Sequence, residues 1–478
     1  MAEYTTAQAG EPTILGEKKS VRMFDMLLFI VSGILVLDTV ATGAAIGVEG
    51  LTWWIILAVL FFLPYALLTS ELGSAWPQEG GIYVWAKEAF GPAWGSMTAW
   101  MYWINLAYWA PSVFVLFVGT MIVGWDLNIS QFWECMIVIA LIWLTMLIVL
   151  FPLRYTKWVA SASAAVKILV VIVLGVAGIT YAVKNGSANS FALSEFKPVW
   201  GSNWAFIPTI VWSLMGFEIM NSAGGAIKNP QRDVPKAIAG AAVLIVGAYM
   251  IGMIGILGSI PLEDISIVSG IADALKMSFA SVFGGATWLF DILIVLILFA
   301  FVGNMVTWTI GCNHTLAATG LDKTAPGVFG HHHKRWGTPD YAIYLTGIVA
   351  TVLTILNYWL FGSREDVFWT IFSLSAVVFL IPFLVMFPAL VVLRRKYPDK
   401  ERPFRVPGGA VGAWLCTILC TTIMALVIFI FFYQVPEDTP KAIFYGICGG
   451  GTILSMIVGW VLYLRAKSRD ESAGGAGS

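Results

Sequence analysis

The chain has 478 residues, of which 59% are hydrophobic and 12% are charged. A typical soluble domain carries about twice this share of charged residues, so the composition excludes an ordinary water-soluble protein and indicates one embedded in lipid. The formal net charge of -1 says little as a total, because in a membrane protein the placement of charge along the chain carries the information.

The N-terminal segment up to Lys19 is polar and lacks the apolar core and small-residue cleavage site of a signal peptide. We therefore expect no removable leader, and we expect the first apolar run to direct insertion. Twelve such runs follow one another at 23–48, 51–70, 93–123, 132–151, 159–183, 204–224, 234–260, 283–317, 341–361, 367–392, 410–433 and 442–464. Since one helical crossing needs roughly 20 apolar residues, the sequence predicts an all-α integral membrane protein of about twelve transmembrane helices.

Basic residues are concentrated in alternate loops. One set of loops and ends carries Lys18, Lys19, Arg22, Lys87, Arg154, Lys157, Lys228, Arg232, Lys236, Lys323, Lys334, Arg335, Arg394, Arg395, Lys396, Lys400, Arg402, Arg405, Arg465, Lys467 and Arg469. The other set holds only Lys184, Lys197, Lys276, Arg364 and Lys441. Because cytoplasmic loops are rich in Lys and Arg, we predict a multi-pass protein of the plasma membrane with both termini in the cytoplasm.

Signatures of enzymes and metal sites are missing from the sequence. The five cysteines lie mostly in apolar runs without metal-ligand spacing, and neither a phosphate-binding loop nor a dinucleotide fingerprint occurs. We expect no catalysis, no cofactor, no metal and no nucleic-acid partner.

Two predicted spans contain an acid where hydrocarbon should be. Asp38 ends the octet VSGILVLD, residues 31–38, and Glu218 ends the octet VWSLMGFE, residues 211–218. Burying such a charge costs about 3 kcal/mol or more, so both acids are candidates for function. The alternative is that each acid merely hydrogen-bonds a neighbouring helix.

The two octets also match each other in pattern, because Gly33 and Gly216 interrupt the first and the sixth span. A repeat offset by five helices places its second copy upside down, as in transporters built from inverted repeats. In those folds the first helix of each repeat is broken near the middle of the membrane, where backbone groups face the substrate. We therefore expect discontinuous first and sixth helices.

Several further motifs carry a family resemblance. They are ELGSAWPQEGGIYVW at residues 71–85, AFGPAWG at 89–95, GFE at 216–218, KNPQRDVPKAI at 228–238, GTP at 337–339, YPD at 397–399 and RPFRVPGG at 402–409. In type and order they resemble the amino acid–polyamine–organocation superfamily over nearly the whole chain. This resemblance implies alternating access by a core of five plus five helices (residues 23–395), followed by two further helices (396–465) between cytoplasmic tails at 1–22 and 466–478.

The chain departs from many members of that superfamily in the first helix. Those members carry Gly-Ser-Gly, whose amides hold a substrate carboxylate, whereas here the corresponding residues are Leu37, Asp38 and Thr39. An ionised Asp38 would repel a carboxylate and attract an ammonium group. The Glu/GABA and plant-type polyamine branches also lack the glycine triplet, so the departure concerns the substrate and leaves the fold expectation intact.

Aromatic residues complete the expected substrate site. Trp212 and Trp308 match positions that gate or line the site in arginine/agmatine-type antiporters of the superfamily, and aromatic faces attract ammonium and guanidinium groups. Tyr102 and Asn105, with Trp103 and Tyr108 beside them, form a polar and aromatic stretch of the third span that serves either binding or packing.

We therefore expect a secondary transporter, an antiporter or a proton-coupled carrier, of amino acids, biogenic amines or polyamines, with a preference for a cationic amine. The expected substrate site consists of Gly33, Asp38, Thr39, Tyr102, Asn105, Trp212, Gly216, Glu218 and Trp308. Glu218 and Asp38 are also the expected proton-coupling groups, which makes protons a candidate partner beside the lipid bilayer. A proton-coupled importer of neutral amino acids and a non-transporting receptor or scaffold of the same fold remain alternatives, and the protein is a monomer or a homodimer.

Overall fold

The computed structural model describes residues 21–199, 207–266, 269–282, 287–360, 364–433 and 441–475. Within these ranges the side chains of Asp38 and of residues 280–282, 287, 364–371, 433, 443 and 472–475 are not described. The predicted N-terminal tail up to residue 20, the beginning of the predicted sixth span and the side chain of Asp38 thus lie outside the described part of the protein.

The described residues are almost entirely helical. The first half contains α1 (Met23–Ile34), α2 (Asp38–Ala44), α3 (Glu49–Leu57), η1 (Ala58–Phe62), α4 (Leu63–Ala75), α5 (Ile82–Phe90), α6 (Pro92–Trp125), α7 (Gln131–Val149), α8 (Leu153–Asn185) and η2 (Leu193–Phe196). The second half contains α9 (Ile207–Ser213), η4 (Ile219–Ala226), α10 (Pro230–Ser259), η5 (Leu262–Asp264), α11 (Gly270–Val282), α12 (Thr287–Leu321), η6 (Gly327–Gly330), α13 (Asp340–Leu360), α14 (Arg364–Lys396), α15 (Gly409–Tyr433), α16 (Lys441–Tyr445), η7 (Gly446–Gly450) and α17 (Gly451–Gly475).

Ten helical segments among the described residues are long and apolar enough to cross a membrane. The two remaining predicted spans, the first and the sixth, are the interrupted pairs α1 with α2 and α9 with η4. The prediction of about twelve transmembrane segments in an all-α protein is therefore confirmed, with two of the twelve broken.

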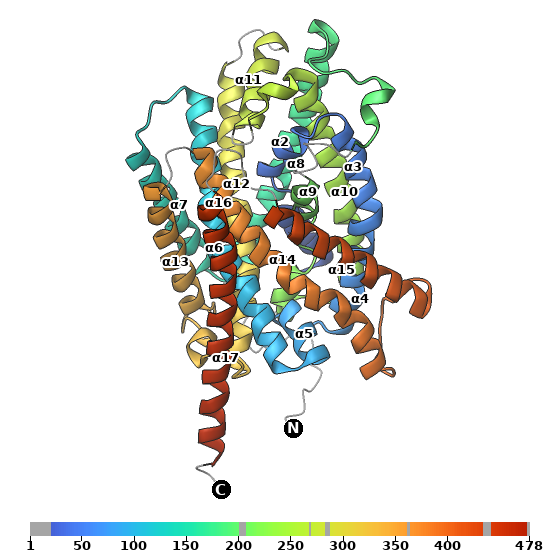
Figure 1. The fold of residues 1–478 in the computed structure, drawn as a ribbon, viewed down its shortest axis with the longest axis vertical. Helices are drawn as coiled ribbons and strands as arrows, with labels where there is room; N and C mark the ends of the chain where they lie inside the picture. The colour runs from blue at the N-terminus through green and yellow to red at the C-terminus, as the bar shows by residue number, and fades with distance from the viewer. Residues whose placement is uncertain are drawn as a thin grey trace.

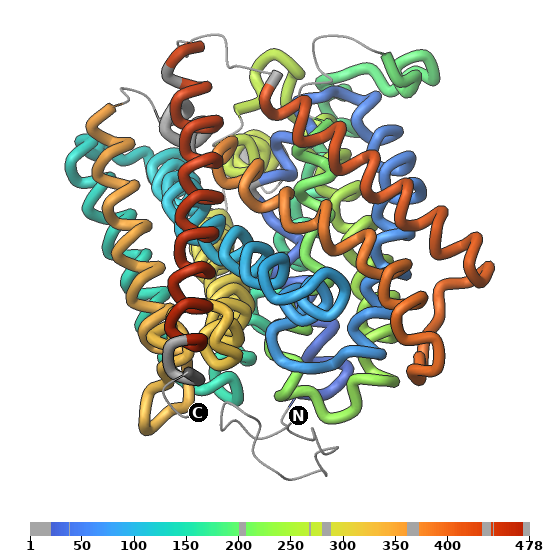
Figure 2. The backbone as a smooth tube through the Cα atoms, turned by 60° about the horizontal axis from the view of Figure 1, so that its bottom comes forward, coloured from blue at the N-terminus to red at the C-terminus, as the bar shows by residue number. Residues whose placement is uncertain are grey.

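The spans form one bundle in which α1 begins and α17 ends at the same end, opposite α11 (Figure 1). Helices α6 and α14 are the most enclosed of the ten spans, since 72% of the apolar window of each is buried, whereas only 22% of the window of the last span is buried. Figure 2 shows α17 running along the outside of the bundle. Accordingly α6 and α14 line the interior, and α17 faces the surrounding lipid.

Small residues bring α8 and α10 into close contact. A Cβ atom on Gly178 would lie only 2.0 Å from the carbonyl oxygen of Gly255. Lipid provides no hydrophobic reason for helices to associate, so such close backbone approach is a main source of packing energy in a membrane. Gly178 and Gly255 therefore hold α10 against α8, and α10 also carries a residue of the candidate site described below.

The two helix breaks differ in their cause. Gly216 has a φ angle of +132°, which an L-residue rarely adopts, and it lies between α9 and η4 as expected. The prediction that Gly33 interrupts the first span is wrong, because Gly33 belongs to the last turn of α1 and the break follows at residues 35–37. A glycine permits an interruption without requiring one, and this break lies where the Tyr249 hydroxyl group of α10 bonds the backbone of Ile34 and Val36.

Candidate functional site

The break after α9 exposes backbone groups and places one carboxylate in the interior. Residues 214–218 connect α9 to η4, and the side chain of Glu218 at the end of this connection is 0% exposed. A Cβ atom on Gly216 would lie 2.9 Å from Cγ1 of Ile34 and 3.2 Å from the ring of Trp308. The site is therefore packed so closely that only glycine fits at this position.

Two tyrosines hold the Glu218 carboxylate. The Tyr65 hydroxyl group, from α4, donates to one carboxylate oxygen and accepts the N–H groups of Gly216 and Phe217 at 3.0 and 3.1 Å. The Tyr102 hydroxyl group, from α6, donates to the other oxygen at 2.7 Å. Both interactions suit an ionised carboxylate, which can only accept hydrogen bonds. Tyr65 thus satisfies both the acid and the backbone freed by the break.

A third tyrosine performs the same task at the break between α1 and α2. The Tyr249 hydroxyl group, from α10, donates to the carbonyl oxygen of Ile34 at 2.8 Å and accepts the N–H group of Val36 at 2.9 Å. Thr39 donates from its hydroxyl group to the carbonyl oxygen of Val36 at 3.0 Å. Asp38 is the first residue of α2, so its backbone lies at this break.

Aromatic rings from four helices meet next to Glu218. The ring centroids of Trp109 and Trp212 lie 5.2 Å apart, and those of Trp109 and Trp308 lie 5.7 Å apart. Phe379 of α14 contacts both Trp308, at 5.3 Å, and Tyr102, at 5.8 Å. The structure thus brings the predicted residues Tyr102, Trp212 and Trp308 into one aromatic cluster.

Trp308 also links this cluster to the first helix. Its indole Nε1 donates to the carbonyl oxygen of Gly33 at 3.0 Å. Gly33 therefore contributes a backbone acceptor close to the break, although it does not cause the break.

One face of α6 lines the site. Tyr102, Asn105 and Trp109 are spaced by three and four residues and therefore share a face of the helix. Trp103 and Tyr108 turn away, since Trp103 donates to Asn313 at 3.0 Å and the Tyr108 hydroxyl group pairs with Ser455 of α17 at 2.8 Å. Of the polar and aromatic stretch in the third span, only the first face belongs to the site.

Several polar atoms on the walls of this site are buried without a hydrogen-bond partner among the described residues. They are the side-chain oxygen of Asn105 and the indole nitrogens of Trp109 and Trp212. A buried polar group without a partner costs about 1–3 kcal/mol. A polar ligand that enters the site could satisfy these atoms and recover that cost.

Lys167 of α8 is a further ionisable residue beside the first break. Its side chain is 1% exposed, and its ammonium group donates to the carbonyl oxygen of Ser32 at 2.6 Å and to Asn304 at 2.7 Å. Sequence reasoning did not select it, although a lysine in the middle of the apolar run 159–183 is the kind of intramembrane charge that indicates function.

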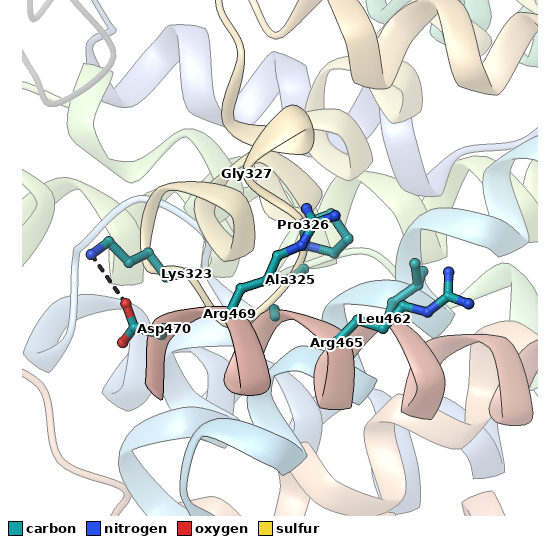
Figure 3. Close-up of a pocket in the computed structure, with 9 residues that line it drawn as sticks. Lys323, Ala325, Pro326, Gly327, Leu462, Arg465, Arg469 and Asp470 are labelled. Carbon is teal, nitrogen blue, oxygen red and sulfur yellow. Dashed lines mark hydrogen bonds and ion pairs between the residues drawn. The ribbon is translucent and has the colours of Figure 1, made fainter. Parts of the chain in front are cut away.

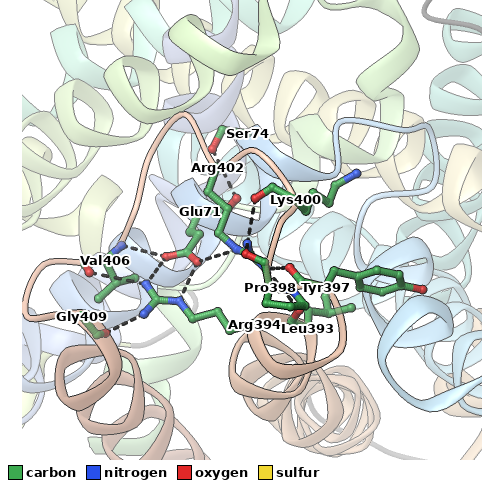
Figure 4. A network of polar contacts seen from close by, with 10 residues as sticks. All are labelled: Glu71, Ser74, Leu393, Arg394, Tyr397, Pro398, Lys400, Arg402, Val406 and Gly409. Carbon is green, nitrogen blue, oxygen red and sulfur yellow. Dashed lines mark hydrogen bonds and ion pairs between the residues drawn. The ribbon is translucent and has the colours of Figure 1, made fainter.

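A charged network joins Glu71 of α4 to α14 and to the loop that follows α14 (Figure 4). Arg394 of α14 donates to both carboxylate oxygens of Glu71, at 2.8 and 2.5 Å, and Arg402 lies 3.5 Å from the same carboxylate. The N–H group of Val406 donates to Glu71 at 2.7 Å. The motif that begins at Glu71 and the motif at residues 402–409 are therefore parts of one structural unit, which anchors the helix that carries Tyr65.

Burial and charge act in opposite directions on Arg402, outside the membrane spans. Burial lowers the pKa of its guanidinium group from the ordinary value, and the Glu71 carboxylate opposes this shift. Arg402 also donates to the carbonyl oxygens of Lys400, at 2.8 Å, and Tyr397, at 2.7 Å. The guanidinium group thus holds together the loop between α14 and α15.

Sequence reasoning missed Tyr65, Tyr249 and Trp109 because tyrosine and tryptophan are common in membrane helices. The only local signal was the position of Trp109 seven residues after Tyr102, two turns further along the same face. No group of three or more His, Cys, Asp or Glu residues that could hold a metal ion occurs in the described ranges.

Comparisons with known proteins identify the family of this chain. The chain is 31% identical over 429 residues to the probable agmatine/putrescine antiporter AguD of Lactococcus lactis, which covers 89% of this chain and 90% of that relative. It is 25% identical over 389 residues to the polyamine transporter PUT1 of Oryza sativa, which covers 81% of this chain and 69% of that relative. A model of the amino acid permease family matches residues 22–454. The family expected from the motifs is confirmed, and the chain belongs to the amino acid permease family of membrane transporters.

Proposed function

We propose that the protein is a secondary transporter of small cationic amines and that Glu218 binds the cationic group. The observation that carries this proposal is the fully buried Glu218 carboxylate at a helix break, held by Tyr65 and Tyr102. An uncompensated carboxylate is expensive in the interior of a membrane protein. A bound ammonium or guanidinium group would supply the missing charge.

The surroundings of Glu218 suit a cation better than a zwitterion. The faces of Trp109, Trp212 and Trp308 attract a cation through their π electrons, by up to roughly 2 kcal/mol when water is excluded. The buried oxygen of Asn105 accepts an N–H donor. The names of the relatives, which include agmatine, putrescine and polyamines, point to the same class of substrate.

Transport requires the side chains around Glu218 to move, because its carboxylate has no exposure in this conformation. We propose that this occurs by alternating access, with α1 to α2 and α9 to η4 as corresponding segments of two inverted repeats. Asp38, at the other break, is proposed as a second acid that binds the cationic group. Protons would compete with the amine for these two acids, which gives amine exchange or proton antiport.

The test is a transport assay with the purified protein in liposomes. Vesicles preloaded with unlabelled putrescine are expected to accumulate radiolabelled putrescine or agmatine, whereas leucine should neither enter nor compete. Leucine uptake driven by a proton gradient would replace this proposal with the neutral amino acid importer. Binding of putrescine without any movement across the membrane would favour a receptor or scaffold.

We further propose that both termini are cytoplasmic and that the protein resides in the plasma membrane. Ion pairs between Lys157 and Asp25, at 3.1 Å, and between Lys87 and Asp322, at 2.5 Å, join helix ends at which basic residues gather.

In a cysteine-free background, single cysteines near Lys396 and near Asp264 are expected to react with an impermeant reagent from opposite sides of the membrane. Reaction of both cysteines from the same side would contradict the proposed inverted-repeat arrangement.

A further inference from the structure

A cavity lies between the last helix and the segment that follows α12, at one end of the membrane spans (Figure 3). Its volume is about 390 Å³. Its walls come from Ala325, Pro326 and Gly327 on one side and from Leu462 and Ala466 of α17 on the other. None of the residues that line this cavity belongs to the aromatic site around Glu218.

The rim of the cavity is cationic. It carries Lys323, Arg465 and Arg469 and one acid, Asp470, which pairs with Lys323 at 3.2 Å. Arg465 and Arg469 are exposed, and no ion pair joins either of them to an acidic side chain in the described part of the chain. They lie one helical turn apart on α17, and both line the cavity, where Figure 3 shows the Arg469 side chain extending toward Pro326 and the Arg465 side chain beside Leu462.

Apolar side chains continue from this cationic rim toward the membrane interior. Ile457, Trp460, Val461 and Leu464 are between 39% and 54% exposed and occupy positions i, i+3, i+4 and i+7 along α17, which share one face of a helix. They therefore form one stripe on the least buried of the candidate spans. The combination of an exposed apolar stripe and two exposed arginines at its end matches a phospholipid, whose acyl chains lie along the stripe and whose phosphate meets the arginines.

We infer that this cavity binds the headgroup of an anionic phospholipid. Arg465 and Arg469 bind the phosphate, for which the forked guanidinium group is well suited, and the small residues of 325–327 leave space for the rest of the headgroup. Basic pockets at the cytoplasmic ends of transmembrane helices are suited to such lipids. A bound lipid would fasten α17 to the loop after α12.

The test measures lipid binding to the purified full-length protein in mild detergent by native mass spectrometry. The variant Arg465→Gln with Arg469→Gln is compared with Lys334→Gln with Lys467→Gln, which removes the same charge from exposed residues that do not line the cavity. The arginine variant should bind phosphatidylglycerol about tenfold more weakly than the unmodified protein, equivalent to about 1.4 kcal/mol. The lysine variant should bind it as the unmodified protein does, and phosphatidylcholine should bind weakly to all three.

Two outcomes would overturn the inference. One is equal phosphatidylglycerol affinity of the unmodified protein and the arginine variant. The other is displacement of phosphatidylglycerol by inorganic phosphate at the same concentration, because the cavity would then recognise a free anion and not a lipid. If the double variant is not monodisperse, Arg469→Gln alone provides the same comparison.

Discussion

Tyr102 and Glu218 lie 116 residues apart, and the hydroxyl group of the first donates a hydrogen bond of 2.7 Å to the carboxylate of the second. This contact joins α6, one of the two most enclosed spans, to the connection between α9 and η4. Substrate that binds Glu218 must compete with this hydrogen bond or share the carboxylate with it. Occupancy of the site is thereby linked to the position of the broken helix.

Glu218→Gln should weaken the binding of putrescine or agmatine at least tenfold, or about 1.4 kcal/mol, because the amide cannot neutralise a cation. Isothermal titration or a thermal-shift series with the purified variant measures this. Glu263→Gln removes an exposed carboxylate elsewhere and should leave the affinity unchanged. Wild-type affinity in a monodisperse Glu218→Gln variant would assign Glu218 to structure alone.

The apparent affinity for the cationic amine should fall as the pH drops from about 7.5 to about 5.5, a range in which buried carboxyl groups can titrate. The sign follows from the chemistry, since protonation removes the negative charge to which the amine binds. Uptake into liposomes at fixed substrate concentration, measured across this range, should show the dependence. Glu218→Gln should flatten it, and an unaltered profile in that variant would show that another group responds to protons.

Gly216→Ala should destabilise the protein by about 1–3 kcal/mol, the usual cost of forcing a side chain into a positive-φ conformation. The new Cβ atom would also lie 2.9 Å from Ile34. Thermal unfolding in detergent measures the loss. Gly247→Ala is the matched control, because its Cβ atom meets nothing within 4 Å and its φ angle is helical; equal melting temperatures of the two variants would contradict the strain at Gly216.

Tyr249→Phe should lower the free energy of unfolding by about 1–3 kcal/mol, because the buried Ile34 carbonyl and Val36 N–H groups at the first break lose their partner. Tyr108→Phe provides the comparison, since its hydroxyl group bonds a single side chain and the residue is only partly buried. We expect the Tyr108 variant to lose less stability in the same melting experiment. A larger loss for Tyr108→Phe would mean that the first break does not depend on Tyr249.

Glu71→Gln should cost about 3–5 kcal/mol, as expected when one member of a buried ion pair is removed. Arg394 and Arg402 would then face each other without the carboxylate. A double-mutant cycle with Arg394→Gln separates the interaction energy from the effect of each change. Additive losses in melting experiments would show that the ion pair contributes no coupling.

Much of the protein follows from local properties of the sequence. The number and kind of spans depend on runs of apolar residues, and a run is apolar whatever its neighbours in space are. The acid at Glu218 could be recognised in the same way, since a charge in a predicted span stands out without knowledge of the fold. The position of Gly216 in the second break was also predictable, because a positive φ angle favours glycine.

The tertiary structure alone decided which of these groups meet. Tyr65 reaches Glu218 across 153 residues and Arg394 reaches Glu71 across 323, and neither contact leaves a periodic trace in the chain. The end of α1 likewise lies where Tyr249 from α10 bonds the backbone and not at Gly33. Hydropathy thus determined that each segment lies in the membrane, whereas the pairing of buried polar groups, which depends on helix packing, determined where helices break and which side chains form the site.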